Sequence, residues 1–187
     1  VEILASFRAM PNMAVMRPAD TVETAECWQI AVEHATGPSL LALSRQDTPP
    51  VRRPAPDTPC RTGAYLLHAP DGARAITLVA TGTEVALASA ASEALAQQGI
   101  AAAVVSMPCW ELFETMPEQD RQSVLGTAPR IAIEAAVDFG WSRWLGPTDR
   151  FIGMPGFGAS ARAEVLYDHF GITVDRIVET ARDMLRA

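Results

Sequence analysis

Lysine is absent from this sequence of 187 residues, in which all 15 basic residues are arginine. The basic residues stand against 22 acidic ones, which leaves a formal net charge of −7 at pH 7. A protein that binds the nucleic-acid backbone needs a basic surface, so this balance argues against a nucleic-acid partner. We attribute the absence of lysine to genome composition rather than to function.

Cysteine is scarce as well. Cys27, Cys60 and Cys109 are odd in number, lie far apart and form no C-x-x-C pair. This pattern favours free, buried thiols in a reducing compartment, and we expect a cytoplasmic protein. The three histidines form no metal-ligand pattern with the cysteines, so no zinc site is expected. We also expect neither a membrane-spanning segment nor a signal peptide, because no apolar run has the required length.

Length and composition are those of a globular protein. Apolar residues make up 49% of the chain and charged residues 20%. A chain of 187 residues suits one domain, or one domain and part of another. Because the sequence starts at Val1 and passes at once into Glu2-Ile3-Leu4, a pattern typical of the inside of a helix, we expect a fragment of a longer protein.

Residues 1–46 are organised around the stretch from Gly37 to Gln46. Its short apolar run, Leu40 to Leu43, predicts a buried strand. Upstream, helical spacing predicts a helix over residues 2–10, and a brief strand follows over 14–16. Asp20 and Glu23 then form a capping arrangement that begins a second helix. The apolar face predicted for that helix consists of Val22, Ala25, Trp28 and Val32. The order strand, helix, strand predicts a βαβ unit with parallel strands.

Arg45 comes two residues after the predicted strand, at the end where parallel sheets bind their ligands. A guanidinium group offers a fixed fork of donors suited to phosphate or carboxylate. A structural salt bridge with a local Asp or Glu explains an arginine at this place equally well. Position alone leaves both interpretations open.

Residues 47–62 differ sharply from their surroundings. They contain five prolines and almost no large apolar side chain. Proline at this density disfavours helices and sheet interiors, and indicates a stiff, extended linker. We therefore place a domain boundary at 47–62.

Beyond the linker, residues 63–187 alternate between apolar strand patterns and helical ones. Strands are predicted over 64–68 (an edge strand), 76–80, 101–107, 130–135 and 150–153, and helices over 84–98, 118–125, 161–170 and from about 174. This alternation predicts a second α/β domain with three layers, in which helices cover a mostly parallel sheet of about five strands.

Three further features of this region could carry chemistry, and each has a simpler explanation. Thr81-Gly82-Thr83 joins a strand to a helix and could hold an anion, but a plain helix cap is the commoner use. Glu134 ends a buried strand and could be an acid or base with a raised pKa, although a hydrogen-bonded structural carboxylate fits better. The glycines of residues 153–158 fit no phosphate-loop spacing, and are interpreted as turn residues. The four tryptophans are expected to pack cores or an interface.

An ordered series of short motifs resembles transketolase. It begins with Phe7 to Asn12 (FRAMPN), Arg17 to Asp20 (RPAD) with Glu23, and Leu43 to Gln46 (LSRQ), which look like the closing third of the pyrimidine-binding domain. It continues through Gly63-Ala64-Tyr65, Ala80 to Val85 (ATGTEV), Val105 to Pro108 (VSMP) and Phe157 to Ser160 (FGAS). The resemblance covers essentially the whole chain.

This resemblance implies a function. Transketolases use thiamine diphosphate and a divalent metal such as Mg or Ca to move a two-carbon ketol unit between sugar phosphates in the pentose phosphate pathway, and they act as homodimers. Arg45 matches the arginine of the family's S-R-Q motif, which binds the substrate phosphate. The family's thiamine site and activating glutamate are not in this sequence, so a fragment consisting of residues 1–187 is expected to be inactive alone.

On the same resemblance, residues 1–46 are the end of the pyrimidine-binding domain, 47–62 the linker and 63–187 the C-terminal domain. The last of these is expected to supply packing and dimer contacts. Other enzymes of the thiamine family, deoxyxylulose-phosphate synthase or the β part of a 2-oxo acid dehydrogenase, are alternatives that the S-R-Q motif disfavours, and a split transketolase made of two chains is another. A non-catalytic binding or assembly module, with Thr81 to Glu84 as an anion site, remains the alternative from another class.

Overall fold

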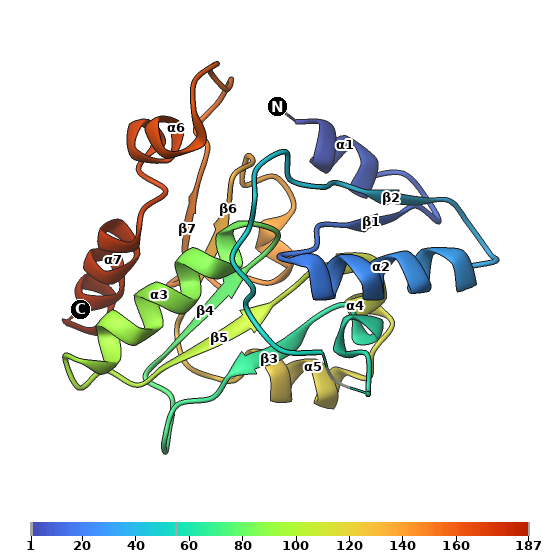
Figure 1. Ribbon diagram of the computed structural model, residues 1–187. Helices are drawn as coiled ribbons and strands as arrows, with labels where there is room; N and C mark the ends of the chain where they lie inside the picture. The colour runs from blue at the N-terminus through green and yellow to red at the C-terminus, as the bar shows by residue number, and fades with distance from the viewer. Residues whose placement is uncertain (1, 55, 187) are drawn as a thin grey trace.

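The structure is a computed structural model that describes residues 2–54 and 56–186. It has two unequal α/β parts (Figure 1). Residues 2–46, called the N-terminal segment below, contain a two-stranded sheet, and residues 63–186, called the C-terminal domain, contain a five-stranded sheet. The N-terminal segment lies across the end of the larger sheet at which β4 (Ile76–Ala80) and β5 (Ala102–Ser106) finish (Figure 1).

The N-terminal segment has the predicted order of elements. They are α1 (Ile3–Arg8), β1 (Ala14–Met16), α2 (Thr21–Glu33) and β2 (Ser39–Leu41). Strands β1 and β2 are parallel, with Val15 opposite Leu40, which confirms the parallel βαβ pattern. The Asp20 side chain accepts a hydrogen bond of 2.8 Å from the Glu23 backbone N–H, so the predicted cap begins α2.

The apolar residues predicted to line one face of α2 do share a face, but this face is mostly exposed and the opposite one is buried. Trp28 is 54% exposed and Val32 is 79% exposed, whereas Glu23 and Cys27 are buried. The side of α2 that carries Glu23 and Cys27 faces inward, because the surface beneath the helix offers hydroxyl donors to the buried carboxylate of Glu23. Polar complementarity at this junction outweighs the apolar periodicity of the helix.

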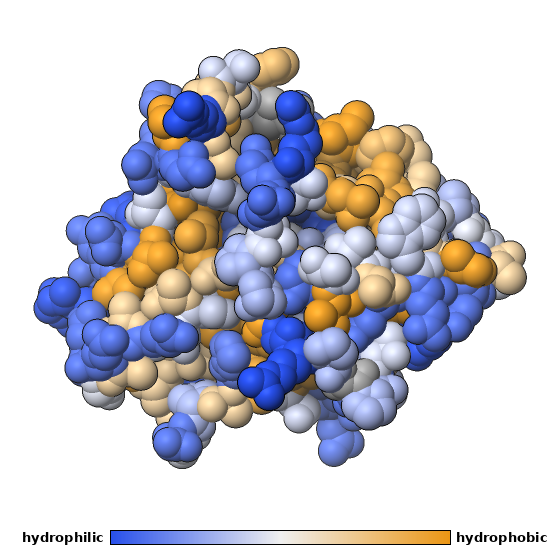
Figure 2. All heavy atoms as spheres, viewed as in Figure 1, coloured by the Kyte–Doolittle hydropathy of each residue, from blue (hydrophilic) through white to orange (hydrophobic). Residues whose placement is uncertain are grey.

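The strand predicted at Leu40 to Leu43 is shorter and less buried than expected. β2 ends at Leu41, its residues are half-buried, and Leu43 is 50% exposed. The cause is that β2 has a neighbour on one side only, among the described residues. Figure 2 shows apolar side chains gathered over α1 and the part of the N-terminal segment beside it. Among the apolar residues there, Ile3 is 61% exposed and Met10 is 46% exposed.

The sheet of the C-terminal domain runs in the order β3-β5-β4-β6-β7. Its strands are β3 (Tyr65–His68), β4 (Ile76–Ala80), β5 (Ala102–Ser106), β6 (Arg130–Glu134) and β7 (Arg150–Gly153). Only β3 is antiparallel to its neighbour, and it lies at the edge as predicted. The predicted fold class, a mostly parallel sheet of about five strands, is confirmed.

Helices cover both faces of this sheet. On one face, α3 (Glu84–Ala96) and α7 (Val174–Arg186) bury residues such as Val85 and Ile177 against Leu78 of β4. On the other face, α4 (Trp110–Glu114), α5 (Glu118–Leu125) and the short helix η2 (Trp141–Arg143) pack against Val79. The alternation of Leu78 and Val79 between the two cores is the period of a strand buried on both faces. The remaining helix, α6 (Ala163–Phe170), precedes α7.

Three tryptophans pack as predicted, since Trp110, Trp141 and Trp144 share the second core. Trp28 lies outside these cores, on the exposed face of α2, where the alternative of an interface stays a prediction. Among the helices of residues 2–54 and 56–186, none is long and apolar enough to cross a membrane. The three cysteines are free and buried, as expected.

Residues 47–62 connect the two parts, and the described residues among them, 47–54 and 56–62, contain one regular element, the short helix η1 (Pro59–Thr62). The connection is bound to both parts at Val51 and Arg52. The Val51 backbone N–H donates to Asp20 over 2.9 Å, and Arg52 lies 2.5 Å from the Glu26 carboxylate. The Arg52 Nε also donates to the Tyr65 hydroxyl over 2.8 Å. The proline-rich stretch therefore lies bound against α2 and β3.

Candidate functional site: the Arg45 cleft

A cleft of about 340 Å³ opens where the N-terminal segment meets the C-terminal domain. Residues 42–46, which follow β2, form one wall, and the turn after β4 forms another. The lining residues that carry polar side chains are Arg17, Ser44, Arg45, Gln46, Thr83, Glu84 and Tyr167. The cleft thus lies at the carboxyl ends of parallel strands from two sheets, where α/β proteins bind their ligands.

Arg45 is exposed and lines this cleft. Within residues 2–54 and 56–186 it forms no ion pair and no hydrogen bond through its side chain. The two residues beside it bond to each other instead: the Gln46 backbone N–H donates to the Ser44 hydroxyl over 3.1 Å. The local salt bridge that position alone left open is therefore not formed, and the guanidinium is available to an anion.

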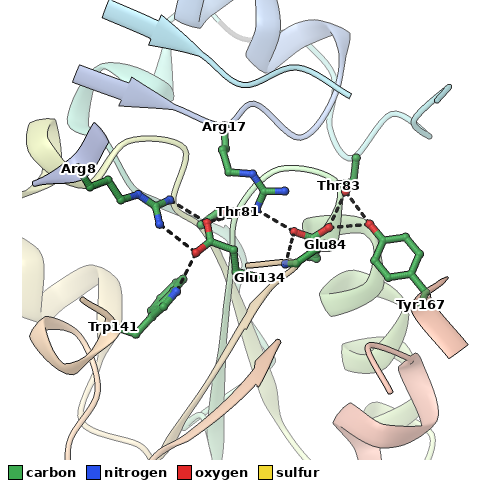
Figure 3. Close-up of polar contacts among 9 residues, drawn as sticks. Arg8, Arg17, Thr81, Thr83, Glu84, Glu134, Trp141 and Tyr167 are labelled. Atoms are coloured by element: carbon green, nitrogen blue, oxygen red, sulfur yellow. Dashed lines mark hydrogen bonds and ion pairs between the residues drawn. The ribbon is translucent and has the colours of Figure 1, made fainter. Parts of the chain in front are cut away.

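Beneath the cleft lies a cluster of buried charges, drawn in Figure 3. Arg17 points down from the end of β1, and its Nη1 lies 2.9 Å from Glu84 Oε2 and 3.2 Å from Glu134 Oε1. Arg8 of α1 donates two parallel hydrogen bonds, of 2.9 and 2.7 Å, to the two oxygens of Glu134. The side chains are 6% exposed for Arg8, 12% for Arg17 and 0% for both glutamates. We call these four residues the arginine cluster.

Glu134 is the centre of the arginine cluster. Besides the two arginines, it accepts hydrogen bonds from Thr81 over 2.8 Å and from the Trp141 ring N–H over 2.9 Å. Burial alone would raise the pKa of Glu134, but the bonds and charges of Arg8 and Arg17 and the Thr81 hydroxyl lower it to about 2. The idea of an acid or base with a raised pKa is therefore wrong, and the hydrogen-bonded structural carboxylate is confirmed.

Arg17 is as firmly held as Glu134. Burial by itself would lower the pKa of Arg17, but Glu84 and Glu134 raise it further above its ordinary value. Its guanidinium also lies flat against Gly82, where a Cβ would be 2.9 Å from the Arg17 Cζ. Gly82 has a φ of +57°, so both its conformation and the closeness of Arg17 require glycine.

The start of α3 does not suit an anion. Thr83 makes no capping hydrogen bond with its side chain. Its hydroxyl donates to Glu84 over 2.6 Å and lies 2.7 Å from the Tyr167 hydroxyl, which also donates to Glu84 over 2.6 Å. A fully buried carboxylate thus occupies the place that an anion would take, which counts against an anion site at Thr81 to Glu84. Thr83 is the N-cap residue of α3, but it caps the helix without a side-chain hydrogen bond.

A second buried carboxylate, Glu23 of α2, joins the same two parts of the molecule. It accepts hydrogen bonds from Ser106 over 2.5 Å, from Tyr65 over 2.6 Å and from the Ala19 backbone N–H over 2.7 Å. It forms no ion pair among the residues that the structure describes. Burial raises the pKa of Glu23, and these hydrogen bonds offset part of the rise. We call Glu23 with its three donors the hydroxyl cluster.

Sequence reasoning missed most of these residues. Arg8 and Arg17 stood only in motifs quoted for their resemblance, and no partner was identified for Glu134. One signal was available in the sequence. Arg17 comes directly after β1, and Arg45 comes a few residues after the neighbouring strand β2, so both arginines stand at the same edge of the sheet. The pairing of Arg8 with Glu134 spans 126 positions and leaves no local trace in the sequence.

The part of the chain that the structure describes does not group the side chains that a metal ion needs. Among residues 2–54 and 56–186 no group of three or more His, Cys, Asp or Glu side chains lies where it could hold a metal ion. Glu84, which lines the cleft, and Glu134 of the arginine cluster are already bound by arginines. A diphosphate with its divalent metal would therefore need ligands from outside this chain.

Comparison with known proteins identifies the family that both parts of the chain resemble. The family model for the transketolase-like C-terminal domain matches residues 63–173, and that for the transketolase pyrimidine-binding domain matches residues 1–50. A transketolase of Sinorhizobium medicae is 57% identical over 188 residues, which cover 100% of this chain and 27% of the relative.

Solved structures show the same similarity. A transketolase from Leishmania mexicana matches with a TM-score of 0.92 and 42% identity, over 100% of this chain and 27% of that one. A transketolase from Pichia stipitis in complex with sedoheptulose-7-phosphate matches with a TM-score of 0.90 and 36% identity, again over 100% and 27%. The chain thus spans about a quarter of the length of these relatives. It belongs to the transketolase family.

Proposed function

We propose that this chain is the C-terminal part of a transketolase, in which Arg45 binds the phosphate group of the sugar substrates. The observation that carries the proposal is the state of Arg45: exposed in a cleft and without an ion pair among the described residues. An arginine at the carboxyl end of a strand with no internal partner is suited to a phosphate ligand. The Pichia stipitis relative, which was solved with a sugar phosphate, supports this choice of substrate class.

Arg45 would act on a part of the substrate that does not react. Two parallel hydrogen bonds from its guanidinium would fix the phosphate, and the phosphate would in turn orient the sugar. Binding energy from such a remote group holds the reacting carbonyl in place for the chemical step. The arginine cluster beneath is electrically balanced, with two arginines and two glutamates, so the positive charge of the cleft comes from Arg45.

Thiamine diphosphate and a divalent metal, Mg or Ca, belong to the complete enzyme in this proposal. When bound, the thiamine ring supplies the nucleophilic carbon for ketol transfer. Since the described residues contain no group of side chains that could hold a metal ion, the ligands of the metal and its diphosphate would come from other parts of the enzyme. The isolated chain would then be inactive in ketol transfer.

The division of the chain follows the same proposal. Residues 1–46 would be the end of the pyrimidine-binding domain, 47–62 its linker and 63–187 the C-terminal domain. The exposed apolar side chains of the N-terminal segment, Trp28 and Val32 among them, fit a surface that other parts of a homodimeric enzyme cover. We propose the cytoplasm as its compartment and the pentose phosphate pathway as its metabolic setting.

The test is Arg45→Ala in the complete enzyme, with kinetics on a phosphorylated ketose donor and on an unphosphorylated one. Loss of a bidentate contact worth about 3 kcal/mol should lower kcat/KM for the phosphorylated donor about 100-fold. The value for the unphosphorylated donor should stay within about twofold. Arg53→Ala is the matched control, because Arg53 is exposed in the linker and does not line the cleft. Equal losses with both donors would refute the role of Arg45.

A further inference from the structure

Arg17 connects the C-terminal domain to the strand pair that carries Arg45. Its side-chain Nη1 donates to Thr81 Oγ1 over 2.7 Å and to Glu84 Oε2 over 2.9 Å. Its backbone bonds to the same domain on both sides: its N–H donates to the Pro108 carbonyl over 2.8 Å, and its carbonyl accepts from Gly82 over 2.9 Å. The residue is therefore fixed at three points by the turns that follow β4 and β5.

The path from Arg17 to Arg45 is short. The preceding residue, Met16, pairs with Leu41 of β2. The Met16 carbonyl also accepts a hydrogen bond of 2.8 Å from the backbone N–H of Ala42, which continues β2. Arg45 follows three residues later, and Arg17, Ala42 and Arg45 line one cleft. A displacement of Arg17 would thus be passed directly to the backbone that carries Arg45.

Glu84 is the group of the C-terminal domain that locks Arg17 at the cleft. Its Oε2 accepts from Arg17 and, over 3.0 Å, from the Ala135 backbone N–H. Its Oε1 accepts from Thr83 and Tyr167, each over 2.6 Å. Figure 3 shows these groups converging on one fully buried carboxylate. Four donors with short bonds hold Glu84 in a single position, and through it they hold Arg17.

We propose that Glu84 and Arg17 are positioning residues for Arg45, through which the C-terminal domain sets the affinity of the enzyme for phosphorylated substrates. The inference rests on the proposed function, in which Arg45 binds the phosphate. A bidentate contact depends on the orientation of both partners, so a small shift of the strand end weakens it. The C-terminal domain then takes part in substrate binding, although neither Glu84 nor Arg17 needs to touch the substrate.

The variant that tests the inference is Glu84→Gln in the complete enzyme. Glutamine has the same shape, and its amide oxygen can accept from Arg17 and Ala135 while its NH₂ group donates to the hydroxyls of Thr83 and Tyr167. The change removes the charge that holds Arg17 and leaves the packing intact. Should this variant fail to fold, Tyr167→Phe removes the hydrogen bond from the Tyr167 hydroxyl to Glu84, and its contact with the Thr83 hydroxyl, without changing a charge.

The expected result is selective. KM for the phosphorylated donor should rise about tenfold, which is less than the ~100-fold cost of a misplacement by 1 Å. The kcat with that donor, and both constants with an unphosphorylated donor, should stay within about twofold. Tyr167→Phe should give the same selectivity with a smaller rise of about threefold. Ile177→Val, in the core behind α3, is the control for a general loss of stability and should change neither KM.

The double variant with Arg45→Ala separates positioning from a merely structural role. If Glu84 acts through Arg45, adding Glu84→Gln to Arg45→Ala should cause no further rise in KM. Unchanged kinetics of the single variant, equal effects on both donors, or a full effect in the Arg45→Ala background would each overturn the inference. Failure of Arg45→Ala itself to discriminate between the donors would overturn the proposed function, and that result does not involve Glu84.

Discussion

Two buried carboxylates, Glu134 and Glu23, fasten the N-terminal segment to the C-terminal domain, and they do so in opposite ways. Glu134 is fully buried and is bound by two guanidinium groups. Glu23 is fully buried too, but its partners are two hydroxyls and one backbone N–H. The pKa of Glu134 is lowered to about 2, whereas the pKa of Glu23 is raised. Both carboxylates are thus buried, and the charge of their partners decides whether the pKa is lowered or raised.

The contrast means that the two junctions respond oppositely to pH. Glu134 binds its proton more weakly in the folded state than in the unfolded state, so its contribution to stability is present above pH 4.5 and is lost as the pH falls toward about 2. Glu23 binds its proton more tightly in the folded state. Its contribution is complete below the ordinary pKa of 4.5 and declines as the pH rises through the raised value.

The largest effect is expected from Glu134→Ala. This change leaves Arg8 without its carboxylate partner, removes one partner of Arg17 and orphans the Trp141 ring N–H. Removing one partner of a buried ion pair typically costs about 3–5 kcal/mol of unfolding free energy. Urea unfolding of the 187-residue chain, followed by circular dichroism, measures the loss. A loss below about 1 kcal/mol would mean that the arginine cluster does not hold the two parts together.

A smaller effect is expected from acid. Between pH 6 and pH 3 the wild-type chain should lose about 2 kcal/mol of unfolding free energy through Glu134, since each unit of pKa shift corresponds to about 1.4 kcal/mol. Glu134→Gln has no proton to bind at this position, so its stability should fall less over the same range. Unfolding of both proteins at several pH values gives the difference, and parallel curves would contradict the assignment.

The smallest effect is expected from Glu23→Gln. The neutral amide avoids the cost of burying a charge and can still bond to Ser106, Tyr65 and Ala19 after reorienting, so we expect a change within about 1 kcal/mol at pH 7. Relative to the wild type, the variant should become more stable as the pH rises from 4 to 8. The same unfolding series detects this trend. A loss as large as that of Glu134→Ala, or a trend of the opposite sign, would show that the two junctions do not differ as described.

Much of the fold was predictable because it rests on local patterns. The apolar runs of β4, β5 and β6 and the cap of α2 at Asp20 depend on neighbouring residues, and the structure confirms them. The buried face of α2 was not predictable. It is determined by Tyr65 and Ser106, which lie 42 and 83 positions away from Glu23. The apolar periodicity of Trp28 and Val32 therefore indicated a face that lies exposed in this chain.

The candidate site divides in the same way. Arg45 could be selected from the sequence because it comes two residues after an apolar run, at the strand end where ligands bind. Its support could not, since Arg8 and Arg17 meet Glu134 across 126 and 117 positions. The sequence shows that Glu134 is a charged residue at the end of a buried strand. Its partners become visible only when α1 and β1 pack against the large sheet. That difference is why Glu134 could be singled out while its partners could not.

The most direct measurement is the structure of the complete enzyme with a phosphorylated ketose bound. We predict the phosphate oxygens at about 2.7–2.9 Å from the Arg45 guanidinium, the distance of a charge-assisted hydrogen bond. Arg17 should remain bound to Glu84 and Glu134 beneath it. A phosphate held away from the cleft, with Arg45 paired to a carboxylate of the protein, would contradict the account.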